Sequence, residues 1–246
     1  RKFVLLVTRD AEEVVGDVDC RANIKPYREA PSKESILKAS ELIQNAKHPV
    51  VLIAAGANRK RIHRELSSFI EKTKIPFVTT QMGKGVLDEM FPSYLGTTAL
   101  SADDYVHCAL ERSDLILCIG HDTVEKPPVI MIPSKREVIH MNFYPTSKEE
   151  ILDDVYVPSH QVVGDIALGL KELTEEISPQ DSWDIQYFNR VAEKMRKQIT
   201  EKSDSSSFPL KPQRIVSDLQ IVLGGYEFGI LCLDNGMYKL WIARGF

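Results

Sequence analysis

The chain has 246 residues, of which 43% are hydrophobic and 27% are charged, and its formal net charge at pH 7 is −4. This composition is typical of a soluble globular protein of one or two domains, and its mild acidity argues against a nucleic-acid partner, which usually leaves a basic patch. No apolar run approaches the roughly 20 residues needed to cross a bilayer, so we expect no membrane partner.

Two smaller features of the composition support this interpretation. The basic run Arg59-Lys-Arg61 is best explained as a solvated helix face, because Glu65 lies four residues after Arg61 and can pair with it. The four cysteines show no metal or redox spacing, which favours a reducing cytoplasm.

The two ends of the chain indicate a fragment of a larger protein. Residues 1–8 are predicted to form a strand, and residues 9–31 are polar and irregular. At the other end, the apolar residues 229–233 are predicted to form a strand just before the sequence stops. A single strand of this kind cannot bury both of its faces alone, so we expect partial domains on both sides of a complete one.

Between these ends, the sequence alternates between helical periodicity and continuous apolar runs. Ser32 is a predicted N-cap for the first helix, and later helices are predicted around 62–70, 104–112, 165–176, 183–202 and 215–223. Buried strands are predicted at 50–55, 75–80, 115–120, 137–142 and 162–163, whereas the segment around Gly96 is predicted as a loop. This rhythm predicts an α/β fold with a doubly wound parallel sheet.

In such a sheet, ligands bind beyond the carboxyl ends of the strands. The loops in that position are 56–58, 81–85, 120–126 and 142–145. Three of them contain glycine, which lets the backbone approach a ligand, but the full Gly-x-Gly-x-x-Gly pattern is missing, and tight turns are the competing explanation.

Several side chains near these loops are candidates for single roles. Asn142 ends a strand where dinucleotide folds often place an acid for the ribose hydroxyls, and it could bond a ribose without charge assistance. Asp165 is predicted to be a helix N-cap that could also meet a ligand. His107, His121 and His140 lack metal-ligand spacing and are interpreted as structural histidines.

Seven segments in a fixed order carry a family resemblance: Ala55–Lys60, Ile75–Gly85, Ser113–His121, Val138–Pro145, Val163–Asp165, Lys211–Gln213 and Leu231–Trp241. The chain resembles thiamine diphosphate-dependent decarboxylases and carboligases, and most closely acetolactate synthase large subunits. The resemblance implies that residues 1–15 are the tail of a pyrimidine-binding domain, 32–178 a central Rossmann-like domain and 209–246 the truncated start of a diphosphate-binding domain. Residues 16–31 and 179–208 would be linkers.

The resemblance also implies an activity. Such enzymes decarboxylate pyruvate and join the product to a second 2-keto acid, giving acetolactate for branched-chain amino acid biosynthesis. Thiamine diphosphate lies between subunits of a homodimer or homotetramer, and Mg²⁺ bridges its diphosphate to a Gly-Asp-Gly…Asn segment. That segment and the catalytic Glu of the family lie outside this sequence, so we assign no catalytic or metal-binding residue here and expect the 246 residues alone to be inactive.

Two departures from the family pattern affect the cofactor sites. Gly236, Met237 and Tyr238 would approach thiamine diphosphate, but many relatives carry Gln-His in place of Met237-Tyr238. Members that bind FAD commonly carry Gly-Ala-Arg-Phe-Asp-Asp-Arg where this chain has Gly-His-Asp-Thr-Val-Glu-Lys at 120–126. Three alternatives therefore stay open for the central domain: it binds FAD, it binds an ADP-like ligand, or it binds no ligand. The candidate contacts for such a ligand are Gly56, Asn58, Thr80, Met82, Gly83, His121, Asn142 and Asp165.

Three other functions compete with a carboligase. One is another 2-keto acid decarboxylase, and a second is a non-catalytic nucleotide-binding or scaffold domain of the same fold. The third is a sirtuin, because Ala55-Gly-Ala is similar to the glycine-rich loop of that family, although the paired Cys-x-x-Cys zinc site of sirtuins is not recognisable.

Overall fold

The computed structural model describes residues 28–98, 100, 105–122, 125, 136–146, 158–225, 231–233 and 236–246, with the backbone alone for 237–239. The predicted strand at 1–8 and most of the first linker lie outside these residues. Within the described part, no helix is long and apolar enough to span a membrane.

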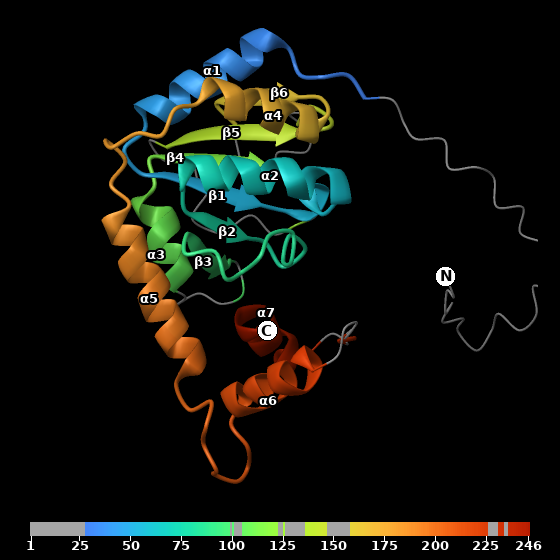
Figure 1. The fold of residues 1–246 in the computed structure, drawn as a ribbon, viewed down its shortest axis with the longest axis vertical. Coiled ribbons are helices and arrows are strands. Elements are labelled where there is room, and N and C mark those ends of the chain that lie inside the picture. Colours follow the sequence, from blue (N-terminus) through green and yellow to red (C-terminus); the bar gives the residue numbers. More distant parts are fainter. Residues whose placement is uncertain are drawn as a thin grey trace, which may run out of the picture.

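A six-stranded, all-parallel sheet forms the centre of the molecule (Figure 1). Its strands, in chain order, are β1 (Pro49–Ile53), β2 (Phe77–Thr79), β3 (Tyr94–Thr97), β4 (Leu115–Ile119), β5 (Glu137–Asn142) and β6 (His160–Val163). In space they follow the order β3-β2-β1-β4-β5-β6. The structure thus confirms the predicted α/β fold with a doubly wound parallel sheet.

Helices cover both faces of this sheet. On one face lie α1 (Lys33–Asn45), α2 (Lys60–Thr73) and α4 (Ile166–Glu176), and on the other lie α3 (Tyr105–Arg112) and α5 (Gln186–Thr200). Side chains of β1 alternate between the two layers, with Val51 and Ile53 in one core and Val50 and Leu52 in the other. Both faces of β1 are therefore dry, which explains why its sequence is a continuous apolar run.

The loop predicted around Gly96 is wrong, because this residue lies in β3, at the edge of the sheet. β3 pairs with β2, and the register shifts between Phe77 and Val78. Gly96 has φ +121°, and a Cβ atom there would lie 2.2 Å from the sulfur of Met195 on α5. A four-residue strand with an irregular register and a central glycine has no recognisable sequence period, so the pattern indicated a loop.

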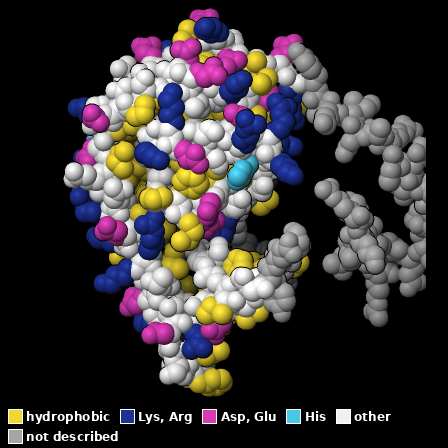
Figure 2. All heavy atoms as spheres, viewed as in Figure 1, with side chains coloured by type: hydrophobic (Ala, Val, Ile, Leu, Met, Phe, Trp, Pro, Cys, Tyr) yellow, Lys and Arg dark blue, Asp and Glu magenta, His cyan; other side chains and the backbone are white. Residues whose placement is uncertain are grey.

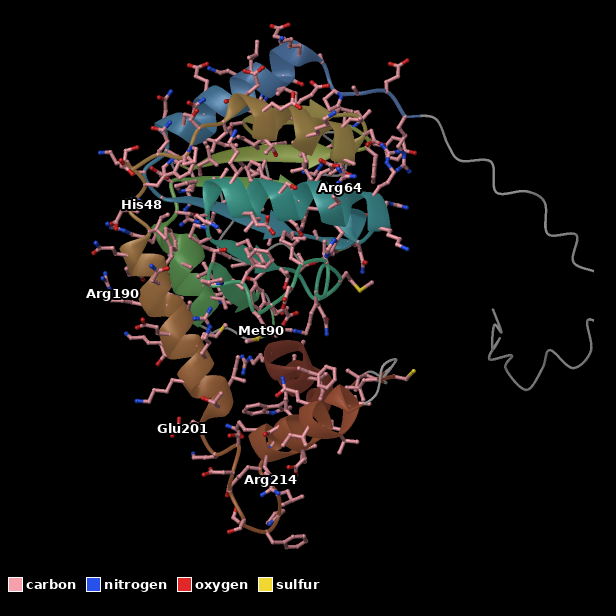
Figure 3. The ribbon with its side chains drawn as sticks, viewed as in Figure 1. His48, Arg64, Met90, Arg190, Glu201 and Arg214 are labelled. Carbon is pink, nitrogen blue, oxygen red and sulfur yellow. The ribbon has the colours of Figure 1, made fainter. Side chains whose placement is uncertain are left out.

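The helix predicted at 183–202 is shorter in the structure, where α5 begins at Gln186. Trp183 is buried in front of it, and its indole N–H donates to the carbonyl of Ile43, 3.2 Å away. The backbone amide of Asp184 donates to the carbonyl of Lys47, and the carboxylate of Asp184 lies 3.3 Å from His48 Nε2. These contacts with the last turn of α1 and with the α1–β1 loop hold the residues before α5 outside the helix (His48 is labelled in Figure 3).

Two last helices, α6 (Pro212–Gly224) and α7 (Met237–Gly245), lie beside the β3 edge of the sheet (Figure 1). The hydroxyl of Thr97 on β3 donates to the carbonyl of Ala243 at 2.9 Å. The side-chain amide of Gln220 on α6 donates to the carbonyl of Gly245 at 2.6 Å. Residues 231–233 of the predicted last strand form no strand, since the described residues offer it no partner, and 229–230 lie outside the described part.

Candidate functional site

The sheet reverses its winding direction between β1 and β4. The chain leaves β1 toward β2 and β3, and it then returns to place β4 on the opposite side of β1. In open α/β sheets this switch point creates the crevice where ligands bind, beyond the carboxyl ends of the strands. The turns after β1 and β4 therefore define the candidate site.

Two glycines bring these turns into direct contact. Gly56 lies in a one-turn 3-10 helix after β1 (Ala55–Ala57), and its amide donates to the carbonyl of Gly120 at 2.8 Å. A Cβ atom on Gly56 would lie 2.8 Å from the Cα atom of Gly120. Gly120 itself has φ +66°, a conformation that favours glycine. The turns of the switch point thus close on each other through their backbones.

The turn after β2 closes on β1 in a similar way. The amide of Thr80 donates to the carbonyl of Ile53 at 2.8 Å, and the Thr80 hydroxyl accepts from the amide of Gly83 at 3.0 Å. A Cβ atom on Gly83 would lie only 2.2 Å from the Ile53 carbonyl oxygen. Gly83 is therefore needed for contact between protein segments, whether or not a ligand approaches it.

Glu125 was not among the predicted site residues, yet it connects three of these segments. One of its carboxylate oxygens accepts from the amide of Ala55 at 2.9 Å, and the other accepts a short hydrogen bond from the hydroxyl of Thr80. Its carboxylate thereby joins the segment after β4 to the turns after β1 and β2. The one sequence signal for it was its place in 120–126, where the resemblance already located a family motif.

His121 and Asn142 form the other side of the crevice. The side-chain amide of Asn142 donates to the carbonyl of His121 at 2.9 Å and lies 3.3 Å from His140 Nε2, and its carbonyl oxygen accepts from the amide of Phe143. The His121 side chain is only 3% exposed. Burial, reinforced by nearby His140, lowers the pKa of His121 to about 4, so its imidazole is neutral at pH 7.

Asp165 has the predicted capping role and an additional partner. Its carboxylate accepts from the amide of Leu168 at 3.1 Å as the N-cap of α4. The same oxygen lies 3.2 Å from the guanidinium of Arg61. The predicted pairing of Arg61 with Glu65 is wrong: Glu65 lies 3.8 Å from Arg64 instead, because Arg61 is at the end of α2 that faces the start of α4.

A basic groove runs between these two helices. It is lined by Lys60, Arg61, Arg64, Glu65, Ala167, Leu168 and Lys171. Figure 2 shows Lys and Arg side chains gathered at this end of the sheet, and Arg64 is labelled on α2 in Figure 3. The groove lies on the outer side of the helices and is separate from the crevice at the switch point.

The remaining predicted contacts are either exposed residues of the same turns or residues near the C-terminal end of the chain. Asn58 and Met82 are exposed, and Met82 is 62% accessible. Gly236 is the N-cap of α7, beside the edge strand β3, and Met237 and Tyr238 begin that helix. The structure therefore brings together Gly56, Thr80, Gly83, His121 and Asn142, and it places Asp165 at the neighbouring end of β6.

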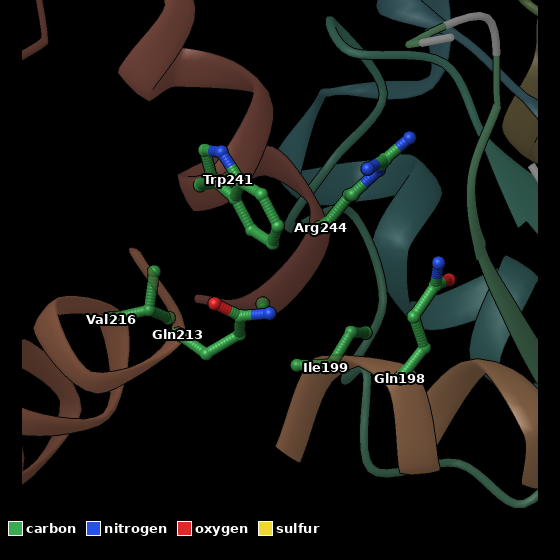
Figure 4. A pocket seen from close by; sticks show the side chains of 7 residues that line it. Gln198, Ile199, Gln213, Val216, Trp241 and Arg244 are labelled. Atoms are coloured by element: carbon green, nitrogen blue, oxygen red, sulfur yellow. The ribbon is translucent and has the colours of Figure 1, made fainter. Parts of the chain in front are cut away.

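The start of α7 fits an anionic group such as a diphosphate. Gly236 adds no capping side chain to the amides of the first helical turn, and such amides are acceptor-seeking groups that bind phosphate well. The other end of α7 is fixed where α5, α6 and α7 meet around a small cavity (Figure 4). That cavity is lined by Gln198, Ile199, Gln213, Val216, Trp241, Arg244 and Gly245.

Among the described residues, the polar groups of the switch-point crevice do not fit a flavin dinucleotide as they are arranged. The polar groups that would bind its phosphates and ribose already bond to the protein: Gly56 to Gly120, Thr80 to Glu125, and Asn142 to His121. The described residues also place no group of three or more His, Cys, Asp or Glu side chains where a metal ion could be held.

Comparison with known proteins identifies relatives of the chain. Residues 36–173 match the family model of the thiamine pyrophosphate enzyme central domain. A Bacillus subtilis protein named as thiamine pyrophosphate-containing is 31% identical over 219 residues, which cover 88% of this chain and 36% of that protein. The acetolactate synthase large subunit of Corynebacterium glutamicum is 29% identical over 87% of this chain and 34% of its own length.

A third relative is named for a different activity. Pyruvate decarboxylase isozyme 3 of Saccharomyces cerevisiae is 41% identical over 100 residues, which cover 40% of this chain and 18% of that protein. The chain spans about a third of the length of the first two relatives.

Replacing Gly56 with alanine tests the contact between the turns. The new methyl group would lie 2.8 Å from the Gly120 Cα and carbonyl oxygen, so we expect G56A to lower the free energy of unfolding in urea by about 1–3 kcal/mol. The matched control is G224A, at a helical position with no atom within 4 Å of the new methyl group, where the change is neutral or stabilising. Equal stability of both variants would contradict the close approach.

The lowered pKa of His121 predicts that the stability of the fold depends on pH. Because the folded-state pKa lies below the unfolded value of 6.5, stability is full above about pH 6.5 and falls as pH drops toward 4. The loss over this window amounts to about 3 kcal/mol. Urea unfolding at a series of pH values should show H121Q with a reduced slope there, whereas H63Q, at an exposed position, keeps the wild-type slope. An unchanged slope in H121Q would argue against a buried, neutral imidazole.

Proposed function

Since the chain belongs to the thiamine pyrophosphate enzyme family through its central domain, we propose that it is part of a thiamine diphosphate-dependent carboligase that condenses 2-keto acids with decarboxylation. The favoured reaction converts pyruvate to acetolactate. The observation that supports it is the extent of the likeness to an acetolactate synthase large subunit, which covers 87% of this chain and so extends beyond the matched residues 36–173.

The domain boundaries and cofactor contacts belong to this proposal. Residues 32–178 form the central domain, 179–208 connect it, and 209–246 begin the diphosphate-binding domain, with 1–15 as the end of a pyrimidine-binding domain. Thiamine diphosphate, when bound, supplies the electron sink that loss of carbon dioxide requires. In this chain, Gly236 and the first-turn amides of α7 would hold its diphosphate, and Met237 and Tyr238 would lie beside it.

The connecting segment has a structural part in this arrangement. Its helix α5 packs on the face of the sheet with the buried side chains of Phe188, Val191, Ala192 and Met195. The end of α5 then contacts α7 through Ile199, which would lie 3.1 Å from a Cβ atom on Gly245. Because α5 packs on the sheet and contacts α7, it fixes the helix that would hold the diphosphate relative to the sheet.

The parts of the mechanism beyond these residues are also proposals. We propose Mg²⁺ as the partner of the diphosphate, a homodimer or homotetramer as the active assembly, and the cytoplasm as its location. We leave FAD out of the active form, because the crevice that would hold it is closed by the chain's own groups.

A simple 2-keto acid decarboxylase is the second candidate. It is favoured by the 41% identity with a yeast pyruvate decarboxylase over 100 residues. The two reactions share the loss of carbon dioxide and differ in the acceptor, which is a second 2-keto acid in one and a proton in the other. They are therefore separated by their products.

The assay uses the full-length protein encoded by the gene that contains this chain, with pyruvate, thiamine diphosphate and Mg²⁺. We expect acetolactate without added FAD. Acetaldehyde in its place would support the decarboxylase, and neither product would contradict both. We expect the 246-residue chain alone to form neither, so turnover by that chain would contradict the domain assignment.

A variant in the same assay tests the diphosphate contact. G236V places a branched side chain beside the first-turn amides of α7, so we expect the KM for thiamine diphosphate to rise by about tenfold or more with little change in kcat at saturation. G225A is the control, because its nearest non-neighbouring atom would be 3.5 Å from the new methyl group. An unchanged KM in G236V would place the diphosphate elsewhere.

A further inference from the structure

We infer that Glu125 is a built-in anion that occupies the phosphate position of the switch-point crevice, so that the central domain of this chain excludes a flavin or other dinucleotide. The inference rests on the hydrogen bonds of one carboxylate and on the contacts around it. It does not depend on which 2-keto acid reaction the whole enzyme performs.

The donors that hold Glu125 are those that a ligand phosphate would use. In switch-point sites, a phosphate is bound by backbone amides of the turn after the first strand and by hydroxyl groups nearby. Here the Ala55 amide and the Thr80 hydroxyl are both directed at the Glu125 carboxylate. A carboxylate and a phosphate are both oxyanions that accept charge-assisted hydrogen bonds, so one can replace the other at such donors.

Two further amides near the carboxylate, among the residues that the structure describes, already have acceptors within the protein. Gly56, the next residue after Ala55, gives its amide to Gly120. The amide of Gly83 donates to the hydroxyl oxygen of Thr80, and this hydroxyl in turn donates to Glu125. A dinucleotide phosphate would therefore have to displace Glu125 and break these bonds, and a displaced carboxylate near it would repel it.

Glu125 also holds the site together. It belongs to the segment after β4, and its partners belong to the turns after β1 and β2, so one side chain connects three strand ends. In a protein that binds a nucleotide at this point, the ligand would make such connections. The carboxylate thus makes the hydrogen bonds between the strand ends that a bound phosphate would otherwise make.

The experiment titrates the purified chain with FAD, followed by flavin fluorescence, and with inorganic pyrophosphate, followed by calorimetry. All chains in the pyrophosphate titration carry G236V, which blocks the diphosphate contacts proposed at the start of α7. We expect no saturable binding of FAD to the wild type, and none of pyrophosphate to the chain that carries G236V alone. In E125A, removal of the carboxylate frees the Ala55 amide and the Thr80 hydroxyl, so pyrophosphate should bind at least about tenfold more tightly than to the chain that carries G236V alone. Stoichiometric binding of FAD to the wild type would overturn the inference, and this arm needs no variant to fold.

Two further variants distinguish the effect of the volume of the Glu125 side chain from the effect of its charge. E125Q keeps the shape of the side chain without its charge, so it should still exclude pyrophosphate while its Tm falls by a few degrees. D122A removes an exposed carboxylate of the same segment and should leave the binding of pyrophosphate unchanged. A folded E125A that binds no pyrophosphate, or a gain of binding equal in D122A and E125A, would show that Glu125 does not occupy an anion position.

Discussion

The structure depends on the close approach of two backbone turns at the switch point of the sheet. The amide of Gly56 donates to the carbonyl of Gly120 at 2.8 Å, and a side chain at either position would collide with the other turn. This contact fixes where the chain leaves β1 and where β4 ends. It thereby sets the start of α2.

The consequence is a central domain whose ligand crevice is satisfied from within. The family fold offers a nucleotide site at this place, and this chain fills its donors with Glu125, with the Gly120 carbonyl and with the Asn142–His121 pair. The domain is then held together by its own hydrogen bonds, which agrees with our proposal that its part in the enzyme is to position α7.

Much of this fold could be predicted from local sequence, because strands such as 50–53 are dry on both faces and because Ser32 and Asp165 cap their helices through bonds three residues away. The strand at Gly96 could not be predicted, since its irregular register leaves no period. The candidate site was only half predictable. Glycines and strand ends mark its edges, but the partners of Glu125 lie 70 and 45 residues away in sequence, and no local pattern encodes such pairs.

Amide hydrogen exchange at Ala55 and Gly56 tests the central claim most directly. If the crevice is closed by the chain's own acceptors, both amides exchange as slowly as buried amides of β1, in the absence of any added nucleotide. The amides of Lys60 and Arg61, in the exposed first turn of α2, should exchange much faster and serve as the internal reference. Exchange at Ala55 and Gly56 as fast as at this reference, slowed only by added FAD, would contradict the account.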